Sequence, residues 1–157
     1  AVVCSNCTKS LVASNLIRGQ YGAVFRLVQE YLALGAGAFQ FASAGDVRYI
    51  NNAIEVTSNP FGMQVVGTAD GPSCAFRNNL WLEINDPGNS MPPLPSPETG
   101  GIYGMASGYD ATGKLCASAD GVAGGAGIAL PEVPGTLDGM CRPDPPAIGP
   151  NEIDPGC

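Results

Sequence analysis

A fold prediction for this chain depends on residues 8–34, "TKSLVASNLIRGQYGAVFRLVQEYLAL". Apolar side chains recur there at intervals of three and four residues, the spacing that places side chains on one face of an α-helix. Thr8 is a suitable N-cap, and the glycines at 35 and 37 suit a helix end. The stretch therefore predicts one long N-terminal helix, which Gly19 and Gly22 weaken in its middle.

The rest of the chain predicts shorter elements joined by many turns. Residues 46–56 fit a second short helix, and a strand over residues 47–56 is the alternative. Residues 60–130 predict short strands and loops, because glycine, proline and Asp-Gly turns separate brief apolar runs such as "NLWLEI" at 79–84. Residues 131–157 predict an irregular tail bounded by cysteines. The only internal repetition is the pair of turn sequences "TADG" and "SADG".

These elements together predict one α+β domain over residues 1–157. We expect a long N-terminal helix packed on an antiparallel sheet of short strands, rich in loops and stabilised by disulfides. The length suits a single domain with a sizeable core.

The composition excludes several classes of function. Charged residues make up 13 % of the chain, the net charge is −7, and no basic cluster exists that could neutralise nucleic-acid phosphates. Histidine is absent, so the most common general base and metal ligand is missing. No apolar run is long and uninterrupted enough to span a bilayer. We expect no cofactor and no bound metal.

Six cysteines in a short chain predict three disulfides, no free thiol, and a secreted or cell-surface location. They are Cys4, Cys7, Cys74, Cys116, Cys141 and Cys157. Their connectivity is open, and Cys116–Cys141 is one candidate pair. The Cys4–Cys7 spacing also occurs in redox sites, but a thioredoxin-like site needs a strand before the motif, and zinc needs a second close pair. A structural disulfide is the favoured interpretation.

The carboxylates indicate turns more strongly than catalysis. Most aspartates adjoin glycine or proline or lie one residue away, as expected of turn formers, and no calcium-loop spacing is present. Without histidine, no Ser-His-Asp triad can form. A secreted enzyme that uses carboxylates, or a secreted binding module, remains the alternative to a structural role.

Two families resemble parts of the chain. The predicted long helix, "SNPFG" at 58–62, the short strands and the cysteine-bounded tail resemble the globular part of type IV pilins, although the apolar N-terminal segment and glutamate of those proteins are missing. "VVCSNCT" at 2–8 is similar to the start of minor pilus subunits of type IV secretion systems. Both resemblances imply an extracytoplasmic appendage subunit.

The predicted function is therefore a structural subunit of an extracellular bacterial filament or pilus, with other copies or other pilus subunits as partners. We expect assembly through the helix face, because its apolar stripe is wider than a sheet of short strands needs and its glycines allow close approach of another backbone. The residues of this predicted face are Ile17, Gly19, Tyr21, Gly22, Val24, Phe25, Val28 and Tyr31.

Overall fold

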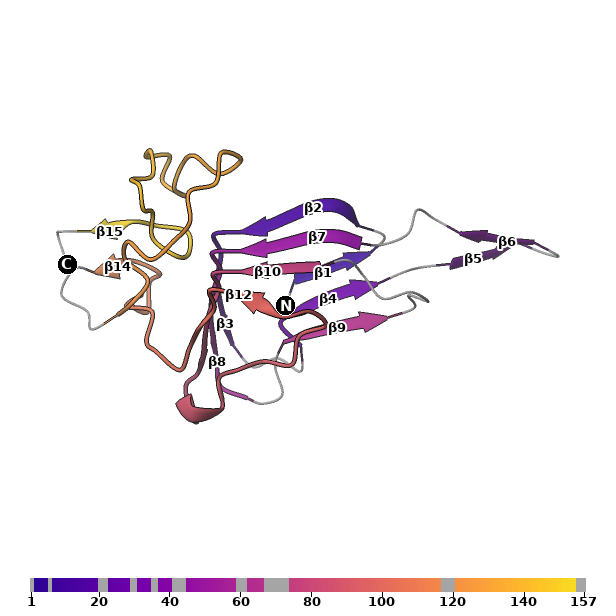
Figure 1. The fold of residues 1–157 in the computed structure, drawn as a ribbon, viewed down its shortest axis with the longest axis horizontal. Helices are drawn as coiled ribbons and strands as arrows, with labels where there is room; N and C mark the ends of the chain where they lie inside the picture. Colours follow the sequence, from indigo (N-terminus) through magenta and orange to yellow (C-terminus); the bar gives the residue numbers. More distant parts are fainter. Residues whose placement is uncertain are drawn as a thin grey trace.

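The computed structural model of the chain describes residues 2–5, 7–19, 23–28, 31–34, 37–40, 45–58, 62–66, 74–116 and 121–154. Within these residues the chain winds through stacked coils, each contributing one strand to each of up to three parallel sheets (Figure 1). The first coil consists of β1 (Val2–Ser5), β2 (Thr8–Ala13) and β3 (Leu16–Gly19), and the second of β4 (Phe25–Val28), β7 (Gly45–Ile50) and β8 (Ala53–Val56). The third coil consists of β9 (Met63–Val66), β10 (Cys74–Arg77) and β11 (Leu80–Glu83). The fourth consists of β12 (Glu98–Thr99) and β13 (Ile102–Tyr103).

The pairing between coils makes this a parallel β-solenoid. The three sheets have the strand orders β1-β4-β9, β2-β7-β10-β12 and β3-β8-β11-β13. Every pair within them is parallel and joins a strand to its counterpart in the next coil. Each coil therefore contacts mainly its neighbours, as in other solenoids.

In the described chain, two further strand pairs lie outside the coils. A hairpin of β5 (Tyr31–Leu34) and β6 (Gly37–Gln40) leaves the second coil between β4 and β7 and extends away from the solenoid (Figure 1). In the C-terminal segment, β14 (Leu115–Cys116) pairs with β15 (Ile153–Asp154). A single 3₁₀ turn, η1 (Pro87–Asn89), follows β11.

A two-residue corner turns the chain from the second sheet to the third in every coil. The first residue of each corner has a positive φ: 55° at Ser14, 54° at Asn51, 54° at Asn78 and 70° at Gly100. Asparagine and glycine tolerate this left-handed conformation better than other residues. The corner therefore explains the first residue of the dipeptides Asn51-Asn52, Asn78-Asn79 and Gly100-Gly101, whereas the first corner has Ser14 in this conformation.

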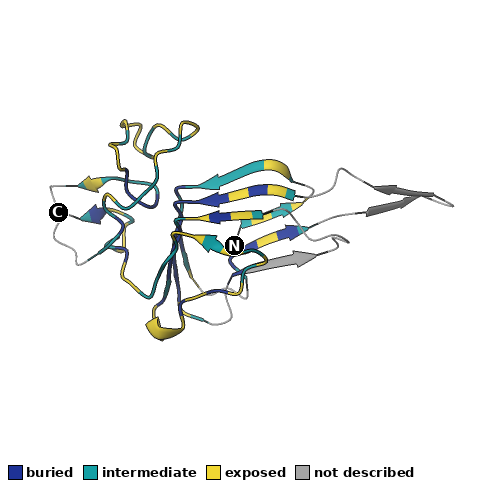
Figure 2. Ribbon diagram, viewed as in Figure 1, coloured by how far each residue is buried: buried dark blue, intermediate teal, exposed yellow. Residues whose placement is uncertain are grey.

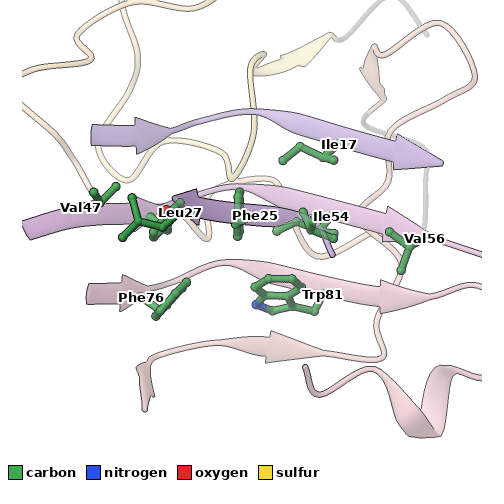
Figure 3. Close-up of a cluster of buried hydrophobic side chains, with 10 residues drawn as sticks. Ile17, Phe25, Leu27, Val47, Ile54, Val56, Phe76 and Trp81 are labelled. Carbon is green, nitrogen blue, oxygen red and sulfur yellow. The ribbon is translucent and has the colours of Figure 1, made fainter. Parts of the chain in front are cut away.

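The core fills the inside of the coils. Val47 and Tyr49 on β7 point inward and are buried, while Arg48 between them is exposed, which is the alternation of a strand with one buried face (Figure 2). Aromatic rings stack from coil to coil: Tyr49 lies parallel to Phe76 with 4.9 Å between ring centroids. Phe25 meets Trp81 edge to face at 5.8 Å. Figure 3 shows these coils contributing to one apolar cluster.

The predicted long helix over residues 8–34 is wrong. The described part of this stretch forms β2, β3, β4 and β5, and the described residues contain no α-helix. Ser14 at φ 55° and Gly19 at φ 139° are incompatible with a continuous helix. Of the described residues, no helix has the length and apolar character that a membrane crossing requires.

The predicted antiparallel sheet and the second helix are wrong as well. Residues 46–56 form β7 and β8 with the Asn51-Asn52 corner between them, so the strand alternative came closer. β9 and β10 belong to different sheets and do not pair with each other. The turn sequence "TADG" at residues 68–71 lies outside the described residues. "NLWLEI" does contain a strand, β11.

Candidate functional site: an open end and a closed end

Asparagine side chains form a hydrogen-bonded ladder through the corners. The backbone N and Nδ2 of Asn15 both donate to Asn52 Oδ1, at 3.2 and 2.8 Å. The same two groups of Asn52 donate to Asn79 Oδ1, at 3.0 and 2.9 Å. Those of Asn79 donate to Glu98 Oε1, at 2.8 and 2.7 Å. Each coil thus donates to the next one along the chain, so the ladder has a direction.

Glu98 closes the ladder at the fourth coil. Its other oxygen, Oε2, accepts from Trp81 Nε1 at 2.8 Å and from the Tyr103 hydroxyl at 3.1 Å. An ionised carboxylate accepts hydrogen bonds and donates none. The ladder therefore cannot continue past this residue in the same way.

A proline-rich segment covers the third coil at the same end. The Pro93 carbonyl lies so close to Gly62, beside the start of β9, that a Cβ on that glycine would meet it at 2.6 Å. Leu94 packs against the apolar core, and Ser96 Oγ donates to the Cys74 carbonyl at 2.7 Å. Proline has no N–H to offer a further strand, so this segment blocks strand addition below β9.

The first coil, in contrast, is open. β1, β2 and β3 are all edge strands of their sheets within the described chain. Inward-facing Val2, Cys4 and Val12 pack on the core but remain partly exposed, whereas Phe25 and Leu27 one coil below are fully buried. Figure 1 shows β2 at the upper edge of its sheet. The difference in burial arises because no described strand pairs with the other edge of β1, β2 or β3.

The amide of Asn15 shows the same end effect. In the lower coils the amide also reaches back to the preceding coil: Asn52 Nδ2 donates to the Val12 carbonyl at 3.0 Å, and Asn79 Nδ2 to the Tyr49 carbonyl at 2.9 Å. Asn15 Nδ2 instead turns to its own strand and donates to the Ala13 carbonyl at 3.0 Å. Within the described residues, Asn15 Oδ1 accepts no hydrogen bond from a protein donor.

A groove of about 530 Å³ lies beside this open corner. Residues 13–16 form one wall, and parts of the C-terminal segment form the other: Thr112, Gly113, Val133, Gly135, Thr136, Leu137, Arg142, Pro150 and Asn151. Asn151 Oδ1 is shielded from solvent and accepts no hydrogen bond from the described chain. Its Nδ2 is fixed by the Gly113 carbonyl at 3.1 Å. The groove thus lies between the corner of the first coil and the C-terminal segment.

The interior carboxylates all have structural partners. Glu55 pairs with Arg18 at 2.5 Å and accepts from the Ser107 hydroxyl, which ties the third sheet to the C-terminal segment. Arg18 reaches that segment through the Tyr109 carbonyl at 2.7 Å and the Asp110 carbonyl. Glu83 accepts from the Asn85 N–H at 2.9 Å. Among the described residues, no three cysteine or carboxylate side chains gather as metal ligands.

The cysteines differ from the predicted three disulfides. Cys4 and Cys7 are joined, with 5.6 Å between their Cα atoms, and Cys116 is also disulfide-bonded. Cys74 is a partly buried free thiol whose pKa is raised by burial, and Cys141 is an exposed free thiol. The Cys116–Cys141 pair and the absence of free thiols were therefore wrong predictions. Cys157 lies outside the described residues.

The described residues of the predicted assembly face are mostly buried or partly buried. Ile17, Val24 and Phe25 are buried inside the chain, and Val28 is partly buried on β4. Gly19 is exposed at the end of β3. Tyr21 and Gly22 lie outside the described residues, and Tyr31 lies in β5, of which only the backbone is described. The described part of residues 8–34 is β-structure and offers no helix face.

Sequence reasoning missed Asn15, Asn52, Asn79 and Glu98. A signal was present in "ASNLI", "INNAI", "RNNLW" and "TGGIY", which begin at residues 13, 50, 77 and 99. The ladder asparagines are separated by 37 and then 27 residues, because the β5–β6 hairpin lengthens the second coil. Such unequal spacing hides a repeat.

Comparison of the chain with protein-family models, with curated proteins and with solved structures finds no match. The arguments about function therefore come from the solenoid itself.

Proposed function

We propose that the chain is a structural module of an extracellular or cell-surface assembly: a β-solenoid closed at its fourth coil that joins the assembly through its first coil. The observation that carries the proposal is the contrast between the two ends. Both ends of the described solenoid have edge strands, but at one of them the Glu98 carboxylate ends the ladder and prolines lie beside β9, whereas at the other β1, β2 and β3 lie over a partly exposed core.

The interior chemistry supports a structural role over a carboxylate enzyme. The described carboxylates Glu55, Glu98 and Glu152 are held by arginine, indole or amide partners that fix the fold. The Cys4–Cys7 disulfide supports an oxidising location.

The test is localisation in cells that produce the chain, by immunogold electron microscopy, with one variant that blocks the open edge. Because Ser14 N donates to the Ile50 carbonyl, strand alternation directs the Leu11 N–H away from the second coil. Leu11→Pro removes that outward donor, and Leu11→Thr, which keeps it, is the matched control. We expect native chain and Leu11→Thr on surface structures, with Leu11→Pro released into the medium as folded protein. Label confined to the cytoplasm, or equal retention of all three chains, would contradict the proposal.

A further inference from the structure

The open end of the first coil has a definite hydrogen-bonding requirement. At each step of the ladder, the upper asparagine donates through its backbone N and its Nδ2 to the lower Oδ1. Within the described residues Asn15 is the uppermost asparagine of this ladder, and its Oδ1 accepts no hydrogen bond from them. A coil placed above it must therefore supply donors at this position.

A second requirement comes from the other half of the Asn15 amide. In the lower coils, Nδ2 of the ladder asparagine also donates a second hydrogen bond to a strand carbonyl of the coil above. Asn52 donates to the Val12 carbonyl in this way, and Asn79 to the Tyr49 carbonyl. Asn15 uses the nearby Ala13 carbonyl in place of such a partner. A strand laid on β2 would offer the carbonyl that the lower corners already use.

We infer that the open end binds a β-strand–asparagine corner–β-strand segment of another polypeptide, added in parallel register above β2 and β3. The asparagine of that segment donates to Asn15 Oδ1, and its flanking strands pair with β2 and β3. This is strand addition, in which backbone hydrogen bonds provide affinity and alternate side chains provide specificity. The groove beside Ser14 gives the incoming corner room against the C-terminal segment. The inference rests on the proposed function and names its partner.

A second copy of this chain does not satisfy the requirement. Stacked head to tail, the copy would present the Glu98 carboxylate, which accepts hydrogen bonds and donates none, and a segment in which four of the eight residues from 91 to 98 are prolines without an N–H. Stacked head to head, two copies would bring two Asn15 Oδ1 acceptors together. The native chain alone should therefore stay monomeric.

The probe is a fluorescent peptide of residues 45–56, GDVRYINNAIEV. In the native fold this segment lies above the third coil, and its Asn52 donates to Asn79 Oδ1 as the inferred partner would donate to Asn15 Oδ1. Binding to the native chain is measured by fluorescence anisotropy. The matched control peptide carries Asn52→Asp, which keeps the shape but replaces the amide donor with a charged acceptor. We expect saturable binding of the asparagine peptide and at least tenfold weaker binding of the aspartate peptide.

Chain variants and sedimentation velocity complete the test. Leu11→Pro should abolish peptide binding and Leu11→Thr should retain it, while circular dichroism confirms that both variants are folded. Equal affinity for the two peptides, or no binding of either, would overturn the inference and leave surface localisation of the native chain untouched. Self-association of the native chain that Leu11→Pro removes would assign the open end to a second copy and would overturn the inference as well.

Discussion

In the coils, residues 2–103, neighbouring strands repeat the same backbone pairing, and one apolar cluster runs through the stack. In the C-terminal segment, residues 104–154, strand pairing is limited in the described chain to β14–β15 and two isolated bridges. There, individual side chains hold many backbone groups at once. Buried backbone N–H and C=O groups need hydrogen-bond partners. The coils supply these partners by repeated strand pairing, and the C-terminal segment supplies them by side chains that each bind several backbone groups.

Arg142 is the clearest example of such a side chain. Its guanidinium donates to the carbonyls of Gly135, Ala147, Gly149 and Pro150 and pairs with Glu152 at 2.8 Å. The Arg142 side chain is only 7 % exposed. Glu152 in turn accepts from the Ala147 N–H at 2.8 Å. One residue therefore organises several turns of this segment.

The largest expected effect is from Arg142→Met. This change leaves the Glu152 carboxylate buried without its charge partner, so the free energy of opening the C-terminal segment should fall by about 3–5 kcal/mol. Hydrogen exchange followed by mass spectrometry measures this for residues 121–154 separately from the coils. The control is Arg48→Met, which removes the exposed pair with Glu132 and should cost less than about 1 kcal/mol. Equal destabilisation of the coils and the segment by Arg142→Met would break the comparison.

The next effect is from Asn52→Leu in the middle of the ladder. The substitution leaves the Asn15 amide and the Val12 carbonyl without their partner in a buried site, so the free energy of unfolding should fall by about 2–3 kcal/mol. Urea denaturation followed by circular dichroism measures it. Asn85→Leu is the control, because Asn85 is exposed and its Nδ2 bonds only the Thr57 carbonyl. If both variants lose the same stability, the ladder does not support the coils.

A pH effect should follow from Tyr109, which anchors the C-terminal segment. Burial is the main cause that raises its pKa to about 12, and its hydroxyl donates to the Ile148 and Asn151 carbonyls. An unfolded tyrosine ionises near pH 10, so Tyr109 contributes full stability below pH 10. That contribution is lost as the pH rises from 10 to about 12.

The measurement is urea denaturation of native chain and Tyr109→Phe at several pH values. The phenylalanine variant should be less stable at pH 8 but show a shallower decline between pH 10 and 12. Other tyrosines contribute the same background to both chains, because Tyr103 also has its pKa raised to about 12, first by burial. Parallel curves for the two chains would show that Tyr109 is not protected from ionisation.

The smallest effect concerns reactivity and leaves stability unchanged. Exposed Cys141 in the C-terminal segment should react quickly with a thiol reagent, and Cys74 on β10 slowly, because its thiol is partly buried with a raised pKa. Cys141→Ser should remove the fast phase and Cys74→Ser the slow phase. If neither phase is present in the native, non-reduced chain, the cysteines are fully paired and the arrangement described here is wrong.

Part of the fold was accessible from the sequence because it depends on local chemistry. The strand at β11, the irregular C-terminal segment and the turns at Asp110 and Asp138 follow from alternation, proline and glycine within a few residues. A Cys4–Cys7 disulfide was likewise among the pairings that the cysteines allowed. The scarcity of charge and the absence of histidine are properties of the sequence alone.

The tertiary structure decided the rest, because the decisive partners are distant along the chain. Apolar residues at 17, 25 and 28 satisfy a helical spacing, yet parallel pairing with β8 and β9 places them in strands. Asn52 is a turn residue in isolation and a ladder residue only when Asn15 lies 37 residues before it and Asn79 lies 27 residues after it. Local propensity cannot encode these contacts: a parallel strand finds its hydrogen-bonding partner only after the chain completes a coil.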